Sequence, residues 1–437
     1  MSRWAVVGGG LLGMTLAHRL AQRGHAVTLL EAADSLGGLA APWRLGDVTW
    51  DRHYHVTLAS DARLRALLRE LDLDDDLRWV RTKTGYYAGP GRLYPLNDAL
   101  DFLRLPALSP LGKARLALTI LYGSRIRDGV RLESVPVTDW LRRWSGRSTY
   151  DRLWLPLLRA KLGDNAEAAS AAFVWATIQR LYAARRTGLK EEQFGYVPGG
   201  GYARTLATFE ALLVAEGVEV RTSTAVRKVA CAKQLSGHGL RVVTDDGDLD
   251  VDACVVTLAA PLAARVCEGL ADDERERLNG VRYQGIVCAS LLLRRPLQPY
   301  YLTYLTDPAA PFTAVVEMTA LVDPAELGGH GLVYLPKYVT PDDPLFEATD
   351  EELRAAWMPY LMAMHPDLAE DDVLAFQVSR VRHVMAVATL DYSAHLPPMR
   401  TSVPGLHLAS SAHIVNGTLN VDETVALAER AVAVIDP

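Results

Sequence analysis

The stretch that decides the fold lies near the start of the chain and reads Arg3-Trp-Ala-Val-Val-Gly8-Gly-Gly10-Leu-Leu-Gly13. An apolar strand pattern, Trp4–Val7, leads into the glycines, and the apolar spacing after them predicts a helix that ends near Gly24. In such a turn the first glycine permits the tight bend, the second lets a pyrophosphate approach the backbone, and the third lets the helix pack against the strand. The pattern therefore predicts the opening of a Rossmann-like domain, with phosphates at a helix N-terminus.

An acidic residue stands where the second strand of this domain is expected to end. The apolar run Ala26–Leu30 is followed by Glu31, which lies 18 positions beyond Gly13. A carboxylate at this point accepts hydrogen bonds from the hydroxyls of a ribose, and it argues against a ribose 2′-phosphate and so against NADP. The fingerprint alone leaves NAD and FAD both open.

Length and composition limit the classes of protein that fit. A chain of 437 residues is too long for one ordinary core, so two domains are expected. The formal net charge of −6 argues against nucleic-acid binding. The four cysteines have no metal-ligand spacing, so we expect no metal site and a reducing compartment. The first strand begins too near residue 1 for a targeting segment, and no apolar run is long enough to span a bilayer, so we expect a cytoplasmic protein.

The periodicity of the chain changes several times and predicts two interleaved domains. Strand and glycine patterns of the nucleotide-binding type occupy residues 1–80, 195–275 and 396–437. Leucine-rich helical patterns occupy much of 81–194, and strand patterns dominate 276–395. The expected fold class is α/β, with a discontinuous Rossmann-like domain of the glutathione-reductase-like kind. A second, substrate-binding domain combines a sheet with a helical insertion.

Further motifs follow one another along the chain. They are the pair Gly37-Gly38, then Trp50-Asp51 followed by His55, then Gly199-Gly200-Gly201, then Thr224-Ala-Val226, and a C-terminal strand and helix that meet around Asn420. Together with the first glycine turn and Glu31, they resemble the flavin-dependent amine oxidase superfamily. Its members include protoporphyrinogen oxidases, carotenoid desaturases and, more distantly, UDP-galactopyranose mutases. The resemblance covers essentially the whole chain.

The resemblance implies FAD as the cofactor. It places the first glycine turn at the pyrophosphate, Glu31 on the adenosine ribose and the Val226 backbone against the adenine. It also places His53–Val56 near the flavin ring and Asn420–Asp422 at its pyrimidine end. The residues expected to contact FAD are Gly8, Gly10, Leu11, Leu12, Gly13, Glu31, Ala32, Gly37, Gly38, Leu39, His53, Tyr54, His55, Val226, Ser411, Asn420 and Val421.

The role of Asn420 can also be argued from physics. A helix N-terminus aimed at the N1–C2=O edge of a flavin stabilises the negative charge of the reduced form. Asn420 could equally be an ordinary N-cap, with Glu423 as its capping-box partner. The two interpretations are compatible.

Three departures separate the chain from typical amine oxidases. Leu39 stands where that family usually has an arginine, and the strand Tyr283–Ser290 lacks the lysine that holds a water at flavin N5. Ser410-Ser411 replaces the usual glycine and acidic residue at the ribitol or phosphate, where a serine hydroxyl bonds more weakly. The first two departures argue against ordinary amine oxidation, and the third indicates a weaker hold on the cofactor or one that is compensated elsewhere.

Two histidines are the candidates for catalysis. His53 and His55 alternate on a segment that we interpret as extended, so we expect their side chains to share one side. Either imidazole could be a proton donor or a polar contact beside the flavin. The alternative is a hydrogen-bonded structural histidine.

The helical insertion carries a local excess of positive charge. From Arg125 to Glu192 there are 13 Lys and Arg against 8 Asp and Glu. This excess could attract an anionic substrate or an anionic membrane surface, or it could form an ordinary solvated helix face. Peripheral membrane contact is most expected at Leu103–Leu108 and the helix after it.

These expectations favour an FAD-dependent oxidoreductase of the dehydrogenase, oxidase or desaturase type. It would act on a small organic substrate, which could be anionic, by hydride transfer to flavin N5. Two alternatives stay open: a redox-neutral, flavin-dependent mutase of nucleotide sugars, and a noncatalytic member of the fold that binds a protein partner. The sequence leaves the substrate, the electron acceptor and the oligomeric state open.

Overall fold

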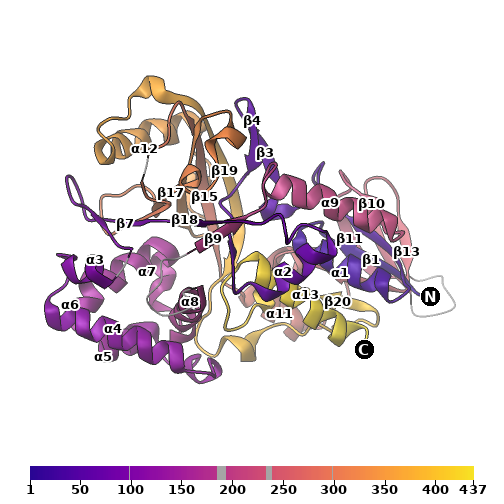
Figure 1. Ribbon diagram of the computed structural model, residues 1–437. Coiled ribbons are helices and arrows are strands. Elements are labelled where there is room, and N and C mark those ends of the chain that lie inside the picture. Colours follow the sequence, from indigo (N-terminus) through magenta and orange to yellow (C-terminus); the bar gives the residue numbers. More distant parts are fainter. Residues whose placement is uncertain (98, 185–192, 233–238, 298) are drawn as a thin grey trace.

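A five-stranded parallel sheet organises the dinucleotide-binding part of the molecule (Figure 1). The computed structural model describes residues 1–97, 99–184, 193–232, 239–297 and 299–437. In spatial order, the strands of this sheet are Glu219–Arg221 (β10), Ala26–Leu30 (β2), Arg3–Val7 (β1), Ala253–Val256 (β14) and Leu406–Leu408 (β20). They come from three separated parts of the chain.

Alternating side chains along β1 divide the surrounding core into two layers. Trp4 and Val6 pack with four helices: α1 (Leu11–Gln22), α2 (Ala62–Glu70), α9 (Tyr202–Ala215) and α13 (Val421–Ile435). Ala5 and Val7 pack with the sheet of β11 (Val226–Cys231), β12 (Leu240–Thr244) and β13 (Leu249–Val251), and with α10 (Ala260–Val266) and α11 (Asp272–Gly280). Both faces of the parallel sheet are therefore covered, as such sheets require.

Three helices on the first face run in the same direction. Helices α1 and α13 pack along each other, and their C-terminal ends meet where the His25 imidazole lies 3.0 Å from Asp436 Oδ2. The first turn of α13 contacts the start of α2, because Asp422 Oδ1 accepts hydrogen bonds from the backbone N–H groups of Arg63 (2.7 Å) and Leu64 (2.9 Å). The N-termini of α1, α2 and α13 therefore open at the same edge of the domain.

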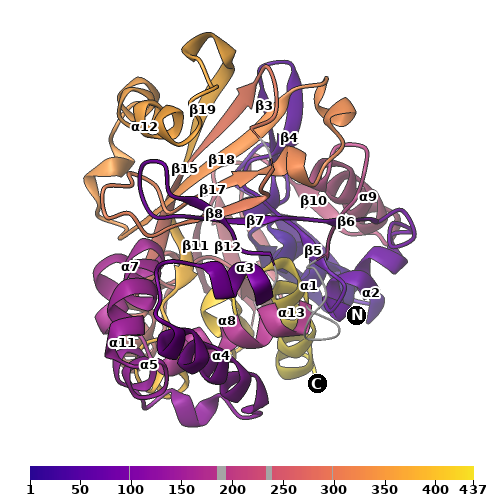
Figure 2. The same cartoon turned by 60° about the vertical axis from the view of Figure 1, so that its left-hand side comes forward.

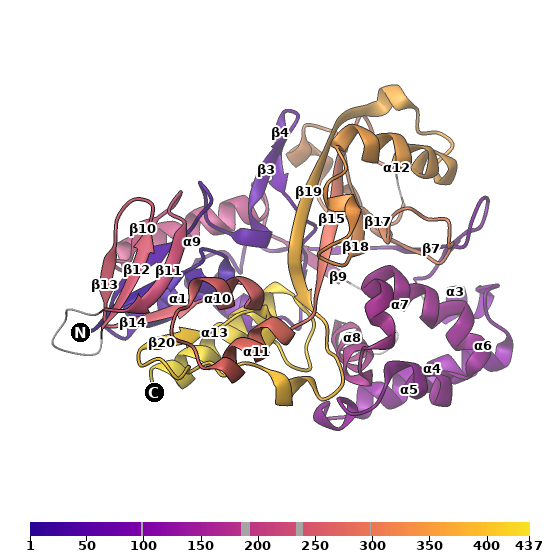
Figure 3. The same cartoon turned by 180° about the vertical axis from the view of Figure 1, so that it is seen from behind.

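A second sheet of seven strands belongs to the other part of the molecule. In spatial order its strands are β19 (Val373–Ala386), β15 (Tyr283–Leu293), β18 (Gly331–Val339), β17 (Ala314–Glu317), β16 (Leu302–Leu305), β7 (Thr84–Tyr87) and β8 (Leu93–Pro95). Helix α12 (Asp350–Met364) packs against the face that carries Val287 and Leu291. The opposite face of β15 carries Ile286 and Cys288 and looks toward the helical insertion (Figure 3).

The helical insertion lies between β8 and the strand Gln193–Tyr196 (β9). Its helices are α3 (Ala99–Arg104), α4 (Pro110–Arg125), α5 (Val137–Ser145), α6 (Arg147–Thr149), α7 (Leu155–Leu162) and α8 (Ala171–Ala184). Figures 1 and 3 place α3 to α6 at the end of the molecule far from the parallel sheet and from both termini. Within the described ranges, no helix is both long and apolar enough to cross a membrane.

Two small sheets connect the parts of the molecule. Strands β3 (Pro42–Leu45) and β4 (Val48–Asp51) form a hairpin, and β5 (Thr57–Leu58), β9 and β6 (Arg78–Arg81) form a three-stranded sheet. The segment between β4 and β5 holds both candidate histidines. The strands of the two large sheets fall within the ranges expected for the two domains, while the domain boundaries themselves stay predictions.

Candidate functional site

Three glycines shape the turn between β1 and α1, each for a different reason. Gly8 has a φ of +107°, which L side chains rarely adopt. A Cβ on Gly13 would lie 1.8 Å from the carbonyl oxygen of Gly8, so α1 approaches β1 at a distance that only glycine permits. A Cβ on Gly10, in contrast, would meet only Gly38 Cα, at 3.9 Å. The space beside Gly10 is therefore open, as a pyrophosphate would require.

A second glycine pair closes one side of this space. The Gly37 N–H donates to the Gly9 carbonyl at 2.8 Å, and a Cβ on Gly38 would lie 3.1 Å from Gly10 Cα. The next residue, Leu39, is half-buried. No side chain in the described chain caps the N-terminus of α1, and its first turn holds no acidic residue. The first N–H groups of α1, those of Leu11 and Leu12 among them, are suited to an anion, which the helix dipole also favours.

Glu31 holds the glycine turn from the end of β2. Its Oε2 accepts a hydrogen bond from the Gly9 N–H at 2.6 Å, and its Oε1 accepts one from the Ala33 N–H at 2.8 Å. Its carbonyl oxygen accepts a bond from the Thr224 N–H at 2.8 Å, which brings the motif that ends at Val226 beside it. A carboxylate has lone pairs beyond these two bonds, so the geometry also allows the expected contact with a ribose.

The two candidate histidines contact different elements. Residues 52–56 form an irregular bend and not a strand. The prediction that the side chains of His53 and His55 share one side depends on strand alternation, so it does not hold here. His53 Nε2 lies 3.3 Å from Ser379 Oγ of β19. His55 Nδ1 lies 3.0 Å from the His53 carbonyl oxygen, and its ring centroid is 5.1 Å from that of Tyr202 in α9. His53 therefore contacts the seven-stranded sheet, and His55 contacts the dinucleotide-binding part.

Burial keeps both imidazoles neutral. It lowers the pKa of His53 to about 3 and that of His55 to about 4, from an ordinary value of 6.5. Neither ring is therefore a cationic acid near neutral pH. His53 Nδ1 is buried and has no hydrogen-bond partner among the described residues. This nitrogen is available to a group that enters the site.

Asp51, at the end of β4, is a residue of the site to which sequence reasoning assigned no role. It is 2% exposed, its Oδ1 accepts a hydrogen bond from the Tyr202 N–H at 3.0 Å, and its Oδ2 lies 3.9 Å from His55 Nδ1. Burial raises its pKa well above the ordinary value of 3.8. The pair Trp50-Asp51 is the sequence signal that marks it. Its partner Tyr202 is 151 positions away, which no local pattern indicates.

Tyrosine side chains line the boundary between the His53–His55 segment and the seven-stranded sheet. The hydroxyl oxygens of Tyr54 and Tyr338 are 2.9 Å apart. The Tyr334 hydroxyl donates to the Asp51 carbonyl oxygen at 2.5 Å. Lys161 of α7 places its Nζ 3.4 Å from the centroid of the Tyr338 ring, a cation–π contact that holds the ammonium against this ring. The segment is therefore tied to β18 by its aromatic residues.

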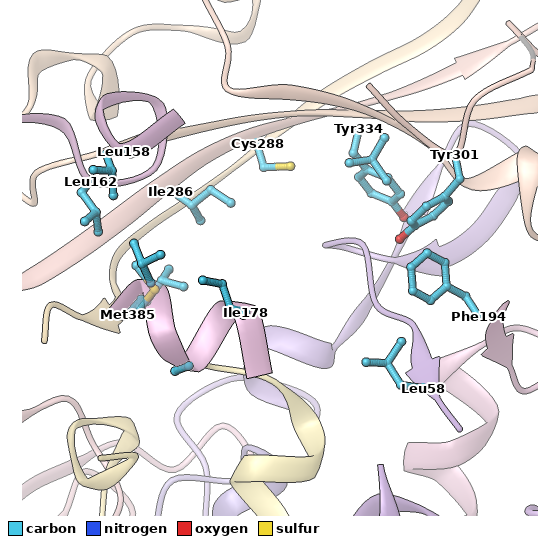
Figure 4. Packing of buried hydrophobic residues seen from close by; sticks show 14 of the residues in the cluster. Leu58, Leu158, Leu162, Ile178, Phe194, Ile286, Cys288, Tyr301, Tyr334 and Met385 are labelled. Carbon is cyan, nitrogen blue, oxygen red and sulfur yellow. The ribbon is translucent and has the colours of Figure 1, made fainter. Parts of the chain in front are cut away.

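An apolar face of β15 continues this boundary. Figure 4 shows Ile286 and Cys288 on the side of the sheet that faces Ile178 of α8, with Tyr334 and Tyr301 farther along. Burial raises the pKa of the Cys288 thiol, so it stays neutral. This surface therefore favours uncharged, apolar groups.

The C-terminal motif lies at the start of α13. Asn420 is an N-cap, because its Oδ1 accepts a hydrogen bond from the Glu423 N–H at 3.0 Å. Val421 begins the helix, and Ser411 begins the short turn Ser411–His413 beside the Tyr283 hydroxyl. The N-cap role is therefore present, and contact of these residues with a flavin stays a prediction.

Most predicted site residues lie along one edge of the dinucleotide-binding part. The glycine turn opens α1, Asn420 opens α13, and the segment His53–His55 precedes α2, whose N-terminus lies at the same edge. Glu31 and Val226 lie beside the turn, at the ends of their own elements.

Metal-ligating groups are not part of this arrangement. Across the described ranges, no cluster of His, Cys, Asp and Glu side chains could hold a metal ion. Cys254, Cys267 and Cys288 are buried, and Cys231 is exposed.

Curated relatives match part of the chain. The carotenoid phi-ring synthase of Streptomyces griseus is 32% identical over 282 residues, which cover 58% of this chain and 52% of that protein. The 15-cis-phytoene desaturase of Synechococcus elongatus is 25% identical over 198 residues, which cover 41% of each chain. The chain thus matches about half the length of these relatives or less.

Solved structures share the fold over the whole chain. A protein from Exiguobacterium sp. 255-15 described as a protoporphyrinogen oxidase has a TM-score of 0.76 at 20% identity, covering 99% of this chain and 98% of its own. A reduced UDP-galactopyranose mutase also has a TM-score of 0.76, at 15% identity, covering 100% of this chain and 94% of its own. At such identities the likeness shows the fold alone.

The family model described as flavin containing amine oxidoreductase matches residues 13–436. This match covers the seven-stranded sheet, the helical insertion, the segment His53–His55 and the start of α13, whereas β1 and the glycine turn up to Leu12 precede it. The chain belongs to the flavin-containing amine oxidoreductase family, whose cofactor is a flavin.

Proposed function

We propose that the protein is an FAD-dependent oxidoreductase of the dehydrogenase or desaturase type, which removes two hydrogens from adjacent carbons of an uncharged, largely apolar substrate, one as a hydride to the flavin and one as a proton to water, and leaves a C=C double bond. One observation carries the proposal. The segment His53–His55 touches both the dinucleotide-binding part, through Tyr202, and the apolar seven-stranded sheet, through Ser379 and Tyr338. A flavin at this segment would have the apolar face of β15 on its substrate side.

The distribution of polar groups supports FAD over FMN. Glu31 and Val226 lie beside the glycine turn, and only a dinucleotide has an adenosine to place there. The residues that would hold FAD are Gly8, Gly10, Leu11, Leu12, Gly13, Glu31, Ala32, Gly37, Gly38, Leu39, His53, Tyr54, His55, Val226, Ser411, Asn420 and Val421. The open space beside Gly10 and the unpartnered His53 Nδ1 fit such a group.

Bound FAD would supply a two-electron acceptor at flavin N5. The chain's own residues would orient the substrate and exclude water. Ile286 and Cys288 belong to the apolar core between β15 and the insertion, and the neutral ring of His53 adds no charge beside it. The ammonium of Lys161 is engaged by the Tyr338 ring. The site therefore favours a neutral hydrocarbon over the anionic substrate that the charge of the insertion suggested.

The names of the curated relatives support the same substrate class. A carotenoid phi-ring synthase and phytoene desaturases are matched over parts of the chain. We therefore propose a polyene or polyprenyl hydrocarbon as the substrate class. Electrons would pass from the reduced flavin to an acceptor that the site does not identify.

The test begins with the flavin itself. The purified protein should be yellow, and the flavin released by heat should run as FAD on chromatography, while Gly10→Ala should be colourless. In anaerobic titrations, polyprenyl or polyene compounds should bleach the flavin, and amines, porphyrinogens and nucleotide sugars should not. Bound FMN, bleaching by amines alone, or interconversion of a nucleotide sugar by pre-reduced protein without net bleaching would each overturn the proposal.

A further inference from the structure

The helical insertion exposes leucines on its outer surface. Leu103 of α3 is 62% exposed, and Leu111 and Leu118 of α4 are 70% and 62% exposed. With Leu121, the α4 residues are spaced by seven and then three positions, so they lie along one side of the helix. We refer to Leu103, Leu111, Leu118 and Leu121 as the α3–α4 face; Figure 2 brings its two helices forward.

Helix α4 buries fewer leucines than it exposes. Its buried side carries Leu116 but otherwise small or polar residues, with Gly112, Thr119 and Gly123 among them. Lys113 is also buried, and its Nζ donates to the Leu103 carbonyl oxygen at 2.6 Å. A surface helix normally buries its leucines and exposes its lysine. The outward leucines are therefore placed to meet an apolar phase outside the protein.

Positive charge surrounds the α3–α4 face. No acidic residue occurs between Asp101 and Asp128. Arg104, next to Leu103, and Arg125, at the end of α4, are both exposed. Exposed arginines continue along the insertion at Arg127, Arg142, Arg143 and Arg147, and at Arg131, which pairs with Asp128 at 3.6 Å. An apolar surface with a cationic border complements a bilayer with anionic head groups, because the leucines enter the acyl region and the arginines meet the phosphates.

We propose that the α3–α4 face docks the protein on the surface of an anionic lipid bilayer. The protein would lie on the membrane without spanning it, since no helix in the described chain is long and apolar enough to cross. A second copy of the chain fits less well, because a two-fold interface would place Arg104 and Arg125 against their own copies or near them. This docking is independent of the proposed redox reaction and of FAD.

The test measures vesicle binding by the full-length protein. It should bind vesicles of phosphatidylcholine with phosphatidylglycerol, bind vesicles of phosphatidylcholine alone more weakly, and be partly released by salt. The double variant L111Q/L118Q should bind more than about ten-fold more weakly to both kinds of vesicle. R104Q/R125Q should lose about five-fold per arginine on the anionic vesicles only.

The controls separate docking from folding. Val214 of α9 is 59% exposed on the opposite part of the molecule, so Val214→Gln should bind like the wild type. All variants should keep the circular dichroism and thermal midpoint of the wild type, and L103Q/L121Q provides a second pair if the first misfolds. Absence of wild-type binding, or equal binding by both leucine pairs and the wild type, would overturn the proposal. The proposal would also be overturned if the wild type were a dimer and L111Q/L118Q a monomer, because a second copy of the chain would then cover the α3–α4 face.

Discussion

Two glycine-to-alanine substitutions in the same turn should have opposite effects. Gly10 has φ −69° and ψ 172°, which alanine adopts without strain, and a Cβ there has no neighbour closer than Gly38 Cα at 3.9 Å. A Cβ on Gly13 would overlap the Gly8 carbonyl oxygen, at 1.8 Å. We therefore expect Gly10→Ala to lose the cofactor while keeping the fold, and Gly13→Ala to lose the fold.

The sizes of these effects follow from the contacts. In Gly10→Ala without cofactor, alanine is a poorer N-cap than glycine but restricts the unfolded chain, so the free energy of unfolding should change by less than about 1 kcal/mol. Its methyl group would displace a phosphate from the first N–H groups of α1. Losing two hydrogen bonds to a charged group, at about 1.5 kcal/mol each, weakens binding by about 3 kcal/mol, or about 150-fold in Kd. Gly13→Ala must separate α1 from β1, so a loss of more than about 4 kcal/mol is expected.

Urea unfolding of the cofactor-free proteins, followed by circular dichroism, measures the free energy of unfolding. Titration with FAD, followed by flavin fluorescence, measures the Kd for the cofactor. Gly280→Ala is the matched control, because a Cβ on Gly280 meets nothing within 4 Å and the residue is remote from the turn. Wild-type affinity of Gly10→Ala for FAD would refute the pyrophosphate site, and equal destabilisation by Gly10→Ala and Gly13→Ala would refute the packing argument.

Three further predictions concern carboxylates and histidine. Glu31→Gln should weaken FAD binding at least about ten-fold, because it removes one charge-assisted bond at the adenosine end and turns an amide NH2 toward the N–H of Gly9 or Ala33; unchanged FAD affinity in a fluorescence titration would contradict the assignment. The pKa of His55 is lowered to about 4 in the folded protein, from 6.5 in the unfolded chain. The contribution of the neutral imidazole to the free energy of unfolding is therefore complete above pH 6.5, and it falls by about 1.4 kcal/mol per pH unit between pH 6.5 and 4. The stability difference between the wild type and His55→Gln in urea should therefore narrow by about 2 kcal/mol from pH 6.5 to 5, and a constant difference would show that the imidazole is not buried. Arg180→Met should cost about 3–5 kcal/mol, because it leaves the buried Asp61 carboxylate without the partner now 3.0 Å away. Adding Asp61→Asn should restore most of that loss, and an unchanged urea midpoint for Arg180→Met would show that solvent screens the pair.

Local sequence patterns predict much of the fold, because each pattern depends on residues that are close together in the chain. The strand, glycine turn and helix at the N-terminus form as the sequence predicts. Glu31 ends its strand beside the glycine turn, as its position after Leu30 indicates. The family prediction is confirmed by the match over residues 13–436.

Contacts between distant residues lay beyond those patterns. The segment after Asp51 was expected to be extended, but the Asp51 carbonyl accepts its bond from the Tyr334 hydroxyl, 283 positions away, and the chain bends there. The bend separates the contacts of His53 from those of His55. Two side chains that are two residues apart share a face only within a regular strand. Nothing in the sequence around Asp51 indicates that strand β4 ends there at a contact with a tyrosine of β18.

The same limit explains why periodicity could not tell the inside of the insertion from its outside. Helix α4 repeats apolar residues on more than one side, and only the structure shows that Leu116 is buried while Leu111 and Leu118 face outward. The inner helices α7 and α8 contribute Leu158 and Ile178 to the core beneath β15. The insertion thus has apolar residues on its inner side and on its outer side, and an exposed apolar patch of this kind marks an interaction surface. The sheet covers the inner surface. A bilayer on the outer surface would cover that patch, and it would place the helices of the insertion between the lipid phase and the apolar face of β15.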